Sequence, residues 1–461
     1  MTNPAAVYRD VLEAIGNTPM IEMQRFDCGP CRLFLKLENQ NPGGSIKDRI
    51  GKSMIEAAER DGTLQPGGRL IEATAGNTGL GLALVAALKG YRLTLIVPDK
   101  MAQEKIFHLK ALGTEVILTR SDVGKGHPEY YQDMAERIAA ETGAFYVNQF
   151  ANPANPLAHE TTTGPEIWAQ MDQQVDALVC GVGSGGTLSG LSRFFEKVSP
   201  QTEIVLADPE GSILTHFVET GEVSKDVGSW VVEGIGEDFI PPNADNLRRV
   251  KTAYSIPDRE ALITARELLA RECILAGSSS GTLIAAALKY CREQTVPKRV
   301  VTFVCDSGNK YLSKMFNDYW MIDQGFIERE RRGDLGDLIG RRHEERGTVV
   351  TGPEDTLLIA YGRMRLYDIS QLPVLDESGK VVGIVDESDI LIRVYEDEAR
   401  FRDRVAGAMT SKLQTVQASE PLDALLPIFA QDHVAIVVDG ERFLGLITRV
   451  DLLNHLRRRM K

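Results

Sequence analysis

Short β-prone runs alternate with helical patterns over residues 69–320, and this alternation restricts the fold more than any other feature. The runs are R-L-I-E-A from Arg69, R-L-T-L-I-V-P from Arg92, E-V-I-L-T from Glu115, F-Y-V-N-Q-F from Phe145, D-A-L-V-C from Asp176, E-I-V-L-A from Glu203 and R-V-V-T-F-V-C from Arg299. Strands that alternate with helices form parallel sheets covered by those helices. The sequence therefore predicts an α/β fold of mostly parallel sheets wrapped by helices, with ligand loops at the carboxyl ends of the strands.

The stretch N-P-G-G-S-I-K-D-R, from Asn41 to Arg49, places Lys47 in the first turn of a predicted helix with Ser45 as its N-cap. The helix dipole favours anions at this end and therefore disfavours the ammonium form of the lysine. An amine with a lowered pKa, beside a Gly-Gly turn where a ligand can approach the backbone, suits Schiff-base chemistry. The alternative is a solvated lysine on a surface helix.

The loop T-A-G-N-T-G, from Thr74 to Gly79, follows an apolar run and precedes the helical pattern L-G-L-A-L-V-A-A-L-K. A turn between a strand and a helix leaves unpaired backbone N–H groups that can bind an anion. We expect a carboxylate to bind here, although an ordinary strand-to-helix connection would have the same pattern.

The loop G-V-G-S-G-G-T, from Gly181 to Thr187, also lies between a predicted strand and a helix, and its small residues suit a phosphate. Its glycines satisfy the dinucleotide-binding pattern G-x-G-x-x-G, and Asp208 follows Gly186 by 22 residues. A nicotinamide oxidoreductase is therefore an alternative. Lys47 and the loop at Thr74 instead favour a phosphate-bearing aldehyde, because that ligand needs both an amine and a phosphate cradle.

A fourth segment, L-A-G-S-S-S-G from Leu275 to Gly281, presents the neutral hydroxyl of Ser279 before another helical pattern. These four segments, in this order, resemble the β-replacing pyridoxal-phosphate enzymes related to cysteine synthase and cystathionine β-synthase. The resemblance spans nearly all of residues 8–320 and opens with V-L-E-A-I-G-N-T-P-M from Val11. It implies the fold of a fold-type II pyridoxal-phosphate enzyme.

The resemblance also implies a role for individual residues. Lys47 would bind pyridoxal 5'-phosphate covalently and exchange a proton with the substrate, and Asn77 would contact the ring hydroxyl. Ser279 would meet the pyridine nitrogen and leave it largely unprotonated, which suits elimination of a β-substituent. The implied phosphate ligands are Gly183, Ser184, Gly185, Gly186 and Thr187. The implied substrate-binding residues are Thr74, Ala75, Gly76, Thr78 and Gly234.

The segment V-V-E-G-I-G-E-D-F-I-P-P, from Val231 to Pro242, resembles the part of cystathionine β-synthases that lines the second-substrate entrance. The implied reaction condenses two small amino acids, L-serine and L-homocysteine, to L-cystathionine and water, and it yields hydrogen sulfide when cysteine replaces serine. Cysteine synthesis from O-acetylserine and sulfide is the alternative within the family. Ala75, Glu160 and Glu237 depart from the family pattern, which affects contacts to the substrate and not the cofactor site.

A dense mixed-charge stretch over residues 327–345 predicts an exposed linker helix or tether. Beyond it, two units each predict strand, turn, strand and the start of a helix; Gly383 and Gly445 are 62 residues apart, as are Asp389 and Asp451. The two units resemble a tandem CBS-domain (Bateman) module. The expected domains are a catalytic domain over 1–326, the linker over 327–345, and CBS domains over 346–400 and 401–461.

In relatives of this module a Thr-x-x-Asp motif binds the ribose of an adenosyl ligand, and Thr448 with Asp451 matches it. Asp386 replaces the threonine in the other repeat, where its carboxylate would repel a phosphate. We expect at most one adenosyl site per chain. The alternatives are a dimerisation or packing module without a ligand and a nucleotide sensor without catalysis.

Composition limits the remaining function classes. The chain has 461 residues, more than one core usually supports, and 43% of them are hydrophobic. It has no run long enough to span a membrane and no signal-peptide pattern, so we expect a cytoplasmic enzyme that acts away from membranes. We also expect the enzyme to be a homodimer. The net charge of −13 argues against nucleic-acid binding.

Metal and haem sites are not expected either. Cys28 and Cys31 form the only C-x-x-C among six cysteines, and neither these nor the seven histidines have zinc-ligand spacing. Only about ten residues precede the resemblance, which is too few for the haem-binding extension of the animal enzymes.

Overall fold

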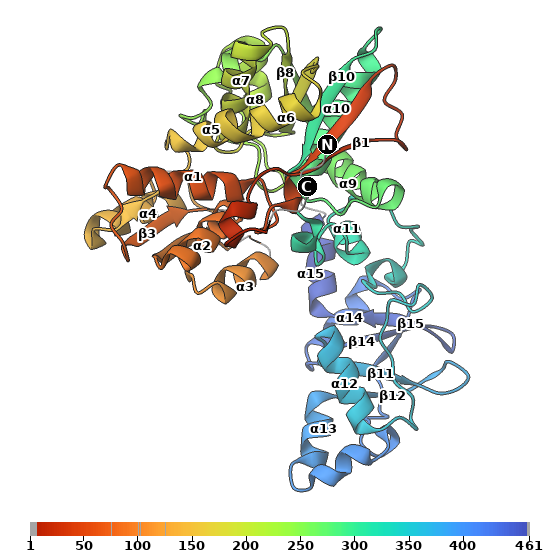
Figure 1. The fold of residues 1–461 in the computed structure, drawn as a ribbon. Helices are drawn as coiled ribbons and strands as arrows, with labels where there is room; N and C mark the ends of the chain where they lie inside the picture. Colours follow the sequence, from red (N-terminus) through yellow and green to blue (C-terminus); the bar gives the residue numbers. More distant parts are fainter. Residues whose placement is uncertain (1–6, 75, 100, 102, 125, 459–461) are drawn as a thin grey trace. The chain divides into compact units, whose positions relative to one another are not determined.

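The chain divides into two compact units in the computed structural model, Met1–Asn317 and Asp318–Lys461. The structure describes residues 7–74, 76–99, 101, 103–124 and 126–458 (Figure 1). Each unit has hydrophobic clusters of its own, as expected of a chain too long for a single core. The boundary lies before residue 326, where the sequence predicted the end of the catalytic domain.

The first unit contains two sheets whose strands are mostly parallel, as the sequence predicted. The larger sheet has the strand order β1-β2-β10-β7-β8-β9, in which β1 pairs antiparallel with β2 and the other pairs are parallel. The smaller sheet, β5-β4-β3-β6, is parallel throughout. The strands are β1 (Met20–Glu22), β2 (Arg32–Leu37), β3 (Arg69–Ala73), β4 (Arg92–Pro98), β5 (Glu115–Thr119), β6 (Phe145–Tyr146), β7 (Ala177–Cys180), β8 (Glu203–Pro209), β9 (Thr252–Ile256) and β10 (Arg299–Val304).

Helices cover both sheets (Figure 1). They are α1 (Lys47–Arg60), α2 (Asn77–Lys89), α3 (Gln103–Ala111), α4 (Tyr131–Thr142), α5 (Ala154–Ala158), α6 (Gly164–Gln170), α7 (Gly186–Val198), α8 (Leu214–Thr220), α9 (Asp258–Glu272) and α10 (Ser278–Glu293). The short helical turns are η1 (Val11–Ala14), η2 (Glu38–Gln40), η3 (His159–Thr163), η4 (Asp245–Arg249) and η5 (Gly308–Tyr311), of which η3 is π-helical. Helices α1 and α2 approach closely at Gly81, which has no side chain. A Cβ there would lie only 2.6 Å from the Lys47 carbonyl oxygen. This contact brings the start of α1 next to α2.

Strands β4 and β5 have the predicted bounds, whereas β6 is shorter than its predicted run. The sequence analysis did not predict β1, β2 or β9. Strand β2 was missed because Lys36 interrupts its apolar run, yet the structure buries this lysine completely. A buried charge requires partners from elsewhere in the fold, which the sequence does not show.

The second unit contains two copies of one small motif, as the repeat predicted. Strands β11 (Gln371–Leu375) and β12 (Val381–Asp386) pair antiparallel, as do β14 (Ala435–Asp439) and β15 (Arg442–Ile447), and β13 (Thr415–Gln417) runs parallel to β14. Both hairpins have a bulge at the same place, after Val374 and after Val437. The helices are α11 (Asp318–Asp323), α12 (Leu357–Tyr367), α13 (Glu387–Val394), α14 (Leu425–Phe429) and α15 (Arg449–Arg458), with short turns η6 (Leu335–Leu338), η7 (Glu398–Arg402), η8 (Val405–Gly407) and η9 (Leu422–Ala424).

Residues 327–345 differ from the predicted exposed linker helix. Their only helical element is the short turn η6, and Leu335, Leu338 and Ile339 are buried in one cluster with residues of the second repeat. The charged residues pair with one another around these apolar side chains, as in the contacts of Arg329 with Glu345 and of Arg332 with Glu344. The segment is therefore part of the second unit's core.

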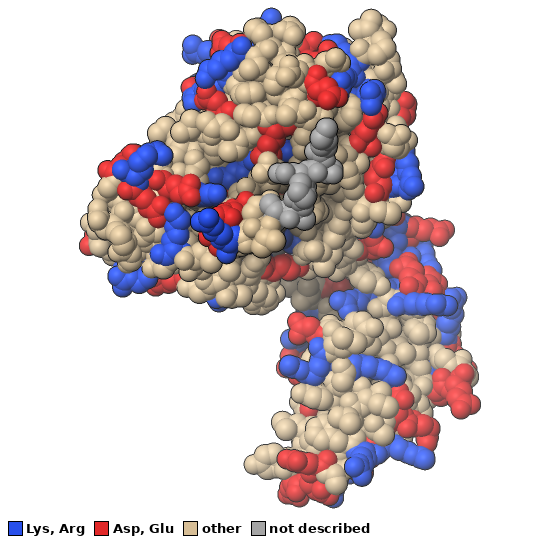
Figure 2. Space-filling model, in the orientation of Figure 1, with Lys and Arg blue, Asp and Glu red and all other residues tan. Residues whose placement is uncertain are grey.

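No helix of the described residues is both long and apolar enough to cross a membrane. On the face shown in Figure 2, basic and acidic side chains are interspersed along the surface. This mixture differs from the basic stripe that is typical of a nucleic-acid-binding surface.

We predict that a fragment of residues 346–461 is far less stable than one of residues 318–461. It lacks Leu335, Leu338 and Ile339, and burial of each such side chain contributes about 1.5–3 kcal/mol, a large share of the roughly 5–15 kcal/mol that stabilises a domain. Urea unfolding followed by circular dichroism measures the difference. Equal midpoints for the two fragments would contradict the packing described here.

Candidate active site

The predicted loops meet at one cavity of about 590 Å³ in the first unit. Two of them follow the carboxyl ends of the parallel strands β3 and β7, where an α/β fold places ligand loops. The predicted site residues that line the cavity are Lys47, Thr74, Gly76, Asn77, Thr78, Gly183, Ser184, Gly185, Gly186, Thr187, Gly234 and Ser279. Ala75, also predicted, lies outside the described residues. Five segments that are far apart in the sequence thus surround one space.

Lys47 is the first residue of α1 and faces the cavity. Ile46 occupies the N-cap position expected for Ser45, but the Ser45 hydroxyl still accepts a hydrogen bond from the Lys47 N–H at 3.3 Å. Burial lowers the pKa of the Lys47 ammonium, and the nearby Cys305, Asp306 and Glu237 only partly oppose this effect. The side chain is therefore available as an amine more readily than a solvated lysine.

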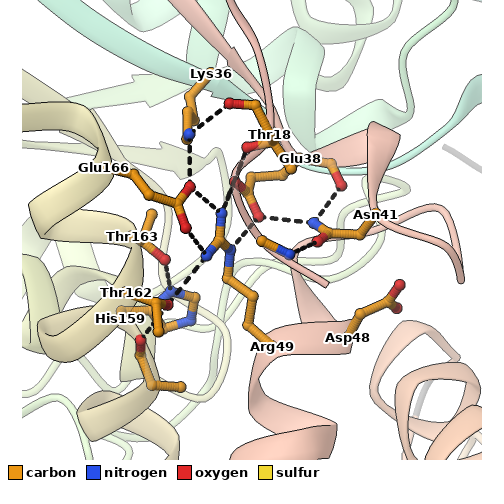
Figure 3. Close-up of polar contacts among 12 residues, drawn as sticks. Thr18, Lys36, Glu38, Asn41, Asp48, Arg49, His159, Thr162, Thr163 and Glu166 are labelled. Atoms are coloured by element: carbon orange, nitrogen blue, oxygen red, sulfur yellow. Dashed lines mark hydrogen bonds and ion pairs between the residues drawn. The ribbon is translucent and has the colours of Figure 1, made fainter. Parts of the chain in front are cut away.

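A buried network of charges holds the start of α1 in place (Figure 3). Two residues after Lys47, Arg49 is 4% exposed and donates two hydrogen bonds to Glu38 in η2, at 2.7 and 2.8 Å. It donates two more to Glu166 in α6, both at 2.7 Å. Residues i and i+2 of a helix point in different directions, so Arg49 anchors the turn while Lys47 reaches the cavity.

Lys36 completes this network and balances its charge. Its ammonium donates to Glu166 at 2.8 Å and to the Thr18 carbonyl oxygen at 2.7 Å. Burial alone would raise the pKa of Glu166, but the Arg49 guanidinium and Lys36 hold it at about 2. Sequence reasoning missed these residues, although Lys36 and Glu38 stand out as charges in or beside an apolar run.

The loop that begins at Thr74 is fixed by hydrogen bonds at its far end. Gly76 has a φ of +136°, and a Cβ there would lie 2.7 Å from the Lys105 Cδ. The Thr78 hydroxyl donates to Gln149 Oε1 at 2.6 Å. This bond uses the hydroxyl proton of Thr78, so its backbone N–H is the donor left for an anion at the N-terminus of α2.

Both the nitrogen and the oxygen of the Asn77 side-chain amide are hydrogen-bonded to neighbouring residues. Its Nδ2 donates to Asp306 Oδ2 at 2.7 Å, and its Oδ1 accepts from Lys310 Nζ at 2.9 Å. Lys310 also donates to the Gly43 carbonyl oxygen at 3.0 Å, which ties Asn77 to the turn before Lys47. These contacts fix the orientation of Asn77 at the edge of the cavity.

The loop from Gly181 to Thr187 is a cradle that side chains would fill. A Cβ at Gly183 would lie 2.5 Å from the Gly234 carbonyl oxygen, so the loop at Gly234 packs directly on the cradle. Gly185 has a φ of +85°, and a Cβ there would meet the Ala244 backbone at 2.6 Å. The backbone N–H groups at the start of α7, with the Ser184 and Thr187 hydroxyls, suit the phosphate of a pyridoxal cofactor.

Ser279 lies in the first turn of α10, which begins at Ser278, so it is part of the helix and does not precede it as the sequence predicted. Its side chain is buried at the cavity wall, where its hydroxyl contacts the Cys305 thiol. A neutral hydroxyl in this position suits a neutral ring nitrogen.

The entrance segment, residues 231–242, contributes ion pairs that the sequence analysis did not predict. Glu233 lies between Lys105 Nζ at 2.5 Å and Lys314 Nζ at 2.7 Å. Glu237 lines the cavity as well. Glu160 does not line it, and its carboxylate instead pairs with Lys197 Nζ at 2.5 Å. Of the two glutamates that depart from the family pattern, only Glu237 is placed to face a ligand.

Asp208 is not available to bind the ribose of a dinucleotide. The residue lies next to the end of β8, which extends to Pro209, one residue beyond the predicted end. It is completely buried, and its carboxylate accepts from the backbone N–H and the hydroxyl of Thr215 at 3.0 and 3.1 Å. The nicotinamide alternative therefore lacks its acidic residue.

In the second unit, Thr448 and Asp451 contact each other at the start of α15. Asp451 Oδ2 accepts from the Thr448 hydroxyl at 2.6 Å and from its N–H at 2.7 Å. Asp386 and Asp389 form the matching capping box before α13. Both pairs therefore cap helices. The two repeats differ in the first residue of the pair, which has a carboxylate in Asp386 and a hydroxyl in Thr448.

Within the described part of the chain, no three His, Cys, Asp or Glu side chains lie close enough to hold a metal ion. Cys28 and Cys31 are buried as free thiols.

Comparison with known proteins extends over both units. Residues 11–306 match the pyridoxal-phosphate dependent enzyme family, and residues 346–396 and 405–458 match the CBS domain family. Cystathionine beta-synthase of Oryctolagus cuniculus is 37% identical over 96% of this chain and 84% of the relative. Cysteine synthase A of Escherichia coli is 42% identical, over 67% of this chain and 94% of the relative. A solved hydrogen sulfide-producing enzyme of Fusobacterium nucleatum has a TM-score of 0.61 and 35% identity, over 66% of this chain and 100% of its own.

The match to cystathionine beta-synthase includes the C-terminal CBS pair, whereas the match to cysteine synthase covers a length close to that of the first unit. The cavity is lined by the Lys47 amine, the glycine-rich loop before α7 and the Ser279 hydroxyl, which are groups that suit a pyridoxal cofactor. The chain therefore belongs to the cystathionine β-synthase family of pyridoxal-phosphate-dependent enzymes.

Proposed function

We propose that this enzyme condenses L-serine with L-homocysteine to L-cystathionine and water, and releases hydrogen sulfide when cysteine takes the place of serine. The observation that carries the proposal is the convergence of Lys47, the Thr74 loop and the glycine cradle on one cavity. A lysine with a lowered pKa, an anion site and a phosphate site together suit an amino acid joined to a pyridoxal group.

Lys47 is the catalytic residue of this proposal. Its amine would hold the cofactor through the aldehyde carbon, and the same amine would accept the proton from the substrate's α-carbon. The pyridoxal group, when bound, supplies the electron sink that makes this proton acidic. Because burial favours the neutral amine, Lys47 can accept the proton without first losing one to solvent.

The cradle residues Gly183, Ser184, Gly185, Gly186 and Thr187, which line the cavity, would hold the phosphate. Asn77 would contact the ring hydroxyl, and Ser279 would meet the ring nitrogen. The N-terminus of α2, with Thr74, Gly76 and Thr78, receives the substrate carboxylate, and Ala75 belongs to the same loop. Gly234 lies against the cradle and borders the space for the substrate.

Two observations support homocysteine as the second substrate over sulfide. Residues 231–238 of the entrance segment line the cavity, and their charged side chains include Glu233 and Glu237, which an amino acid can use and sulfide does not need. The chain also resembles cystathionine beta-synthases through its CBS pair.

We place the enzyme in the cytoplasm as a homodimer. Exposed apolar side chains in the first CBS domain support association, among them Leu366, Ile392 and Tyr395, which are 76–82% exposed. Large apolar side chains gathered on a surface are typical of an interface. The domain bounds 346–400 and 401–461 remain part of this proposal.

Replacement of Lys47 by Ala should abolish cystathionine formation. The loss should exceed the roughly 10²–10⁴-fold effect of removing a single general acid or base, because the covalent anchor is lost as well. Mass spectrometry of the product from serine and homocysteine measures it, with O-acetylserine and sulfide assayed in parallel.

Lys52→Ala is the matched control, because Lys52 lies on the same helix but donates to the Leu12 carbonyl oxygen outside the cavity. It should retain activity. Wild-type enzyme that makes cysteine but no cystathionine would contradict the proposed substrates, and an active Lys47→Ala variant would contradict the role of the lysine.

Replacement of Ser279 by Asp should favour a protonated ring nitrogen, because a carboxylate stabilises a pyridinium and a hydroxyl does not. The visible spectrum of the bound cofactor should change, and the ratio of cystathionine to side products should fall. Ser279→Ala, which removes the hydroxyl without adding charge, is the control. If the spectrum of Ser279→Asp matches that of the wild type, another residue contacts the ring nitrogen.

The CBS pair should bind at most one adenosyl ligand per chain. Titration calorimetry with S-adenosylmethionine and with adenine nucleotides counts the sites. Asp451→Ala should remove binding and Asp389→Ala should not, although each also loses a helix cap that contributes about 1 kcal/mol. Two sites per chain, or binding that persists in Asp451→Ala, would contradict the assignment.

A further inference from the structure

The two hydroxyls of the cradle are contacted from behind by two side chains one helical turn apart. Asn155 in α5 donates from Nδ2 to the Ser184 hydroxyl oxygen at 2.9 Å. His159, which begins η3, has its Nε2 3.2 Å from the Thr187 hydroxyl oxygen. Asn155 and His159 are each 1% exposed, so neither contact is exchanged with water.

We propose that Asn155 and His159 are positioning residues that turn the hydroxyl protons of Ser184 and Thr187 toward the cofactor phosphate. The inference rests on the proposed function, since that function places pyridoxal phosphate in the cradle. A phosphate dianion only accepts hydrogen bonds, whereas a hydroxyl can donate or accept. A hydroxyl that already accepts from the protein has its proton left for the ligand.

The orientation of Asn155 follows from its second contact. Its Nδ2 also donates to the Gln149 carbonyl oxygen at 2.8 Å, and a carbonyl oxygen can only accept. Rotation of the amide by half a turn would bring two oxygens together there. The NH₂ group therefore faces both Gln149 and Ser184, so the Ser184 hydroxyl accepts on this side and donates on the other.

The proposal requires one particular tautomer of His159. Burial lowers the pKa of the imidazole well below its ordinary value, and the nearby Arg49 and Lys47 lower it further while Glu166 opposes them. A neutral ring has one N–H and one acceptor nitrogen. Nδ1 lies 3.0 Å from the Thr163 hydroxyl oxygen (Figure 3). If Thr187 donates to the phosphate, Nε2 carries the ring proton and Thr163 donates to Nδ1.

Glycines in α7 allow this close support. A Cβ at Gly186 would lie 1.8 Å from Asn155 Oδ1, and one at Gly190 would lie 2.2 Å from the Pro156 carbonyl oxygen. The space that side chains would take at these positions is thus occupied by α5 and its neighbours. The helix that carries Thr187 is consequently fixed against the two supporting residues.

The test compares the affinity of the apo-enzyme for pyridoxal phosphate with its affinity for pyridoxal, which lacks the phosphate. Asn155→Asp keeps the shape but replaces the donor by an acceptor, and His159→Leu removes both ring nitrogens. Each variant should lower the affinity for pyridoxal phosphate roughly 10–100-fold, as expected for a lost hydrogen bond to a charged group. His159→Gln, which keeps a donor and an acceptor, should recover part of the loss.

Affinity for pyridoxal should stay within about twofold of wild type in all three variants, because pyridoxal makes no phosphate contact. An equal loss for both ligands would overturn the proposal, since it would mean that the variants act through the fold. Unchanged affinity for pyridoxal phosphate would overturn it as well. Wild-type protein that binds neither ligand would instead refute the proposed function.

The wild-type enzyme gives a second test, which reports the tautomer and not an affinity. Nitrogen NMR of histidine-labelled holoenzyme, with the His159 signals assigned by their absence from His159→Gln, reports the tautomer directly. We expect a neutral ring protonated at Nε2. A ring protonated at Nδ1 would overturn the proposal for His159, because Thr187 would then donate to the ring and not to the phosphate.

Discussion

The paired charges around Arg49 are the interaction on which the rest of the site depends. Arg49 joins α1 to η2 through Glu38 and to α6 through Glu166, and Lys36 balances the second carboxylate. All four groups are buried or nearly so, and loss of one partner from such a pair typically costs about 3–5 kcal/mol. Because Arg49 is two residues from Lys47, the pairing that stabilises the fold also fixes where the amine enters the cavity.

Close backbone contacts then bring the loops around that amine. The approach of α2 to Lys47 at Gly81, and of the Gly234 loop to the cradle at Gly183, leaves no space for side chains. Gln149 links the Thr74 loop to the support of the glycine cradle, since its side chain accepts from Thr78 and its carbonyl oxygen accepts from Asn155. A site built from backbone contacts and satisfied amides is already arranged for a cofactor that brings most of the chemistry itself.

Local patterns in the sequence predicted the parts of the structure that are local. The bounds of β4 and β5, the three loops and the C-terminal repeat follow from residues adjacent in the chain. Lys36, Arg49 and His159 were missed as a group because their partners lie far away in sequence. The segment at Leu335 looked exposed for the same reason: its charges are obvious in the sequence, whereas the cluster that buries its leucines is formed only in the fold.

Chemical trapping of the cofactor tests the central claim most directly. Lys47, Lys105 and Lys314 all line the cavity, so three amines compete for the pyridoxal aldehyde. Reduction of the pyridoxal-phosphate complex with borohydride, followed by peptide mass spectrometry, identifies the amine that holds it. We predict one pyridoxyl group per chain, on Lys47, because Lys105 and Lys314 are paired with Glu233. A label on Lys105 or Lys314, or none in the cavity, would contradict the account.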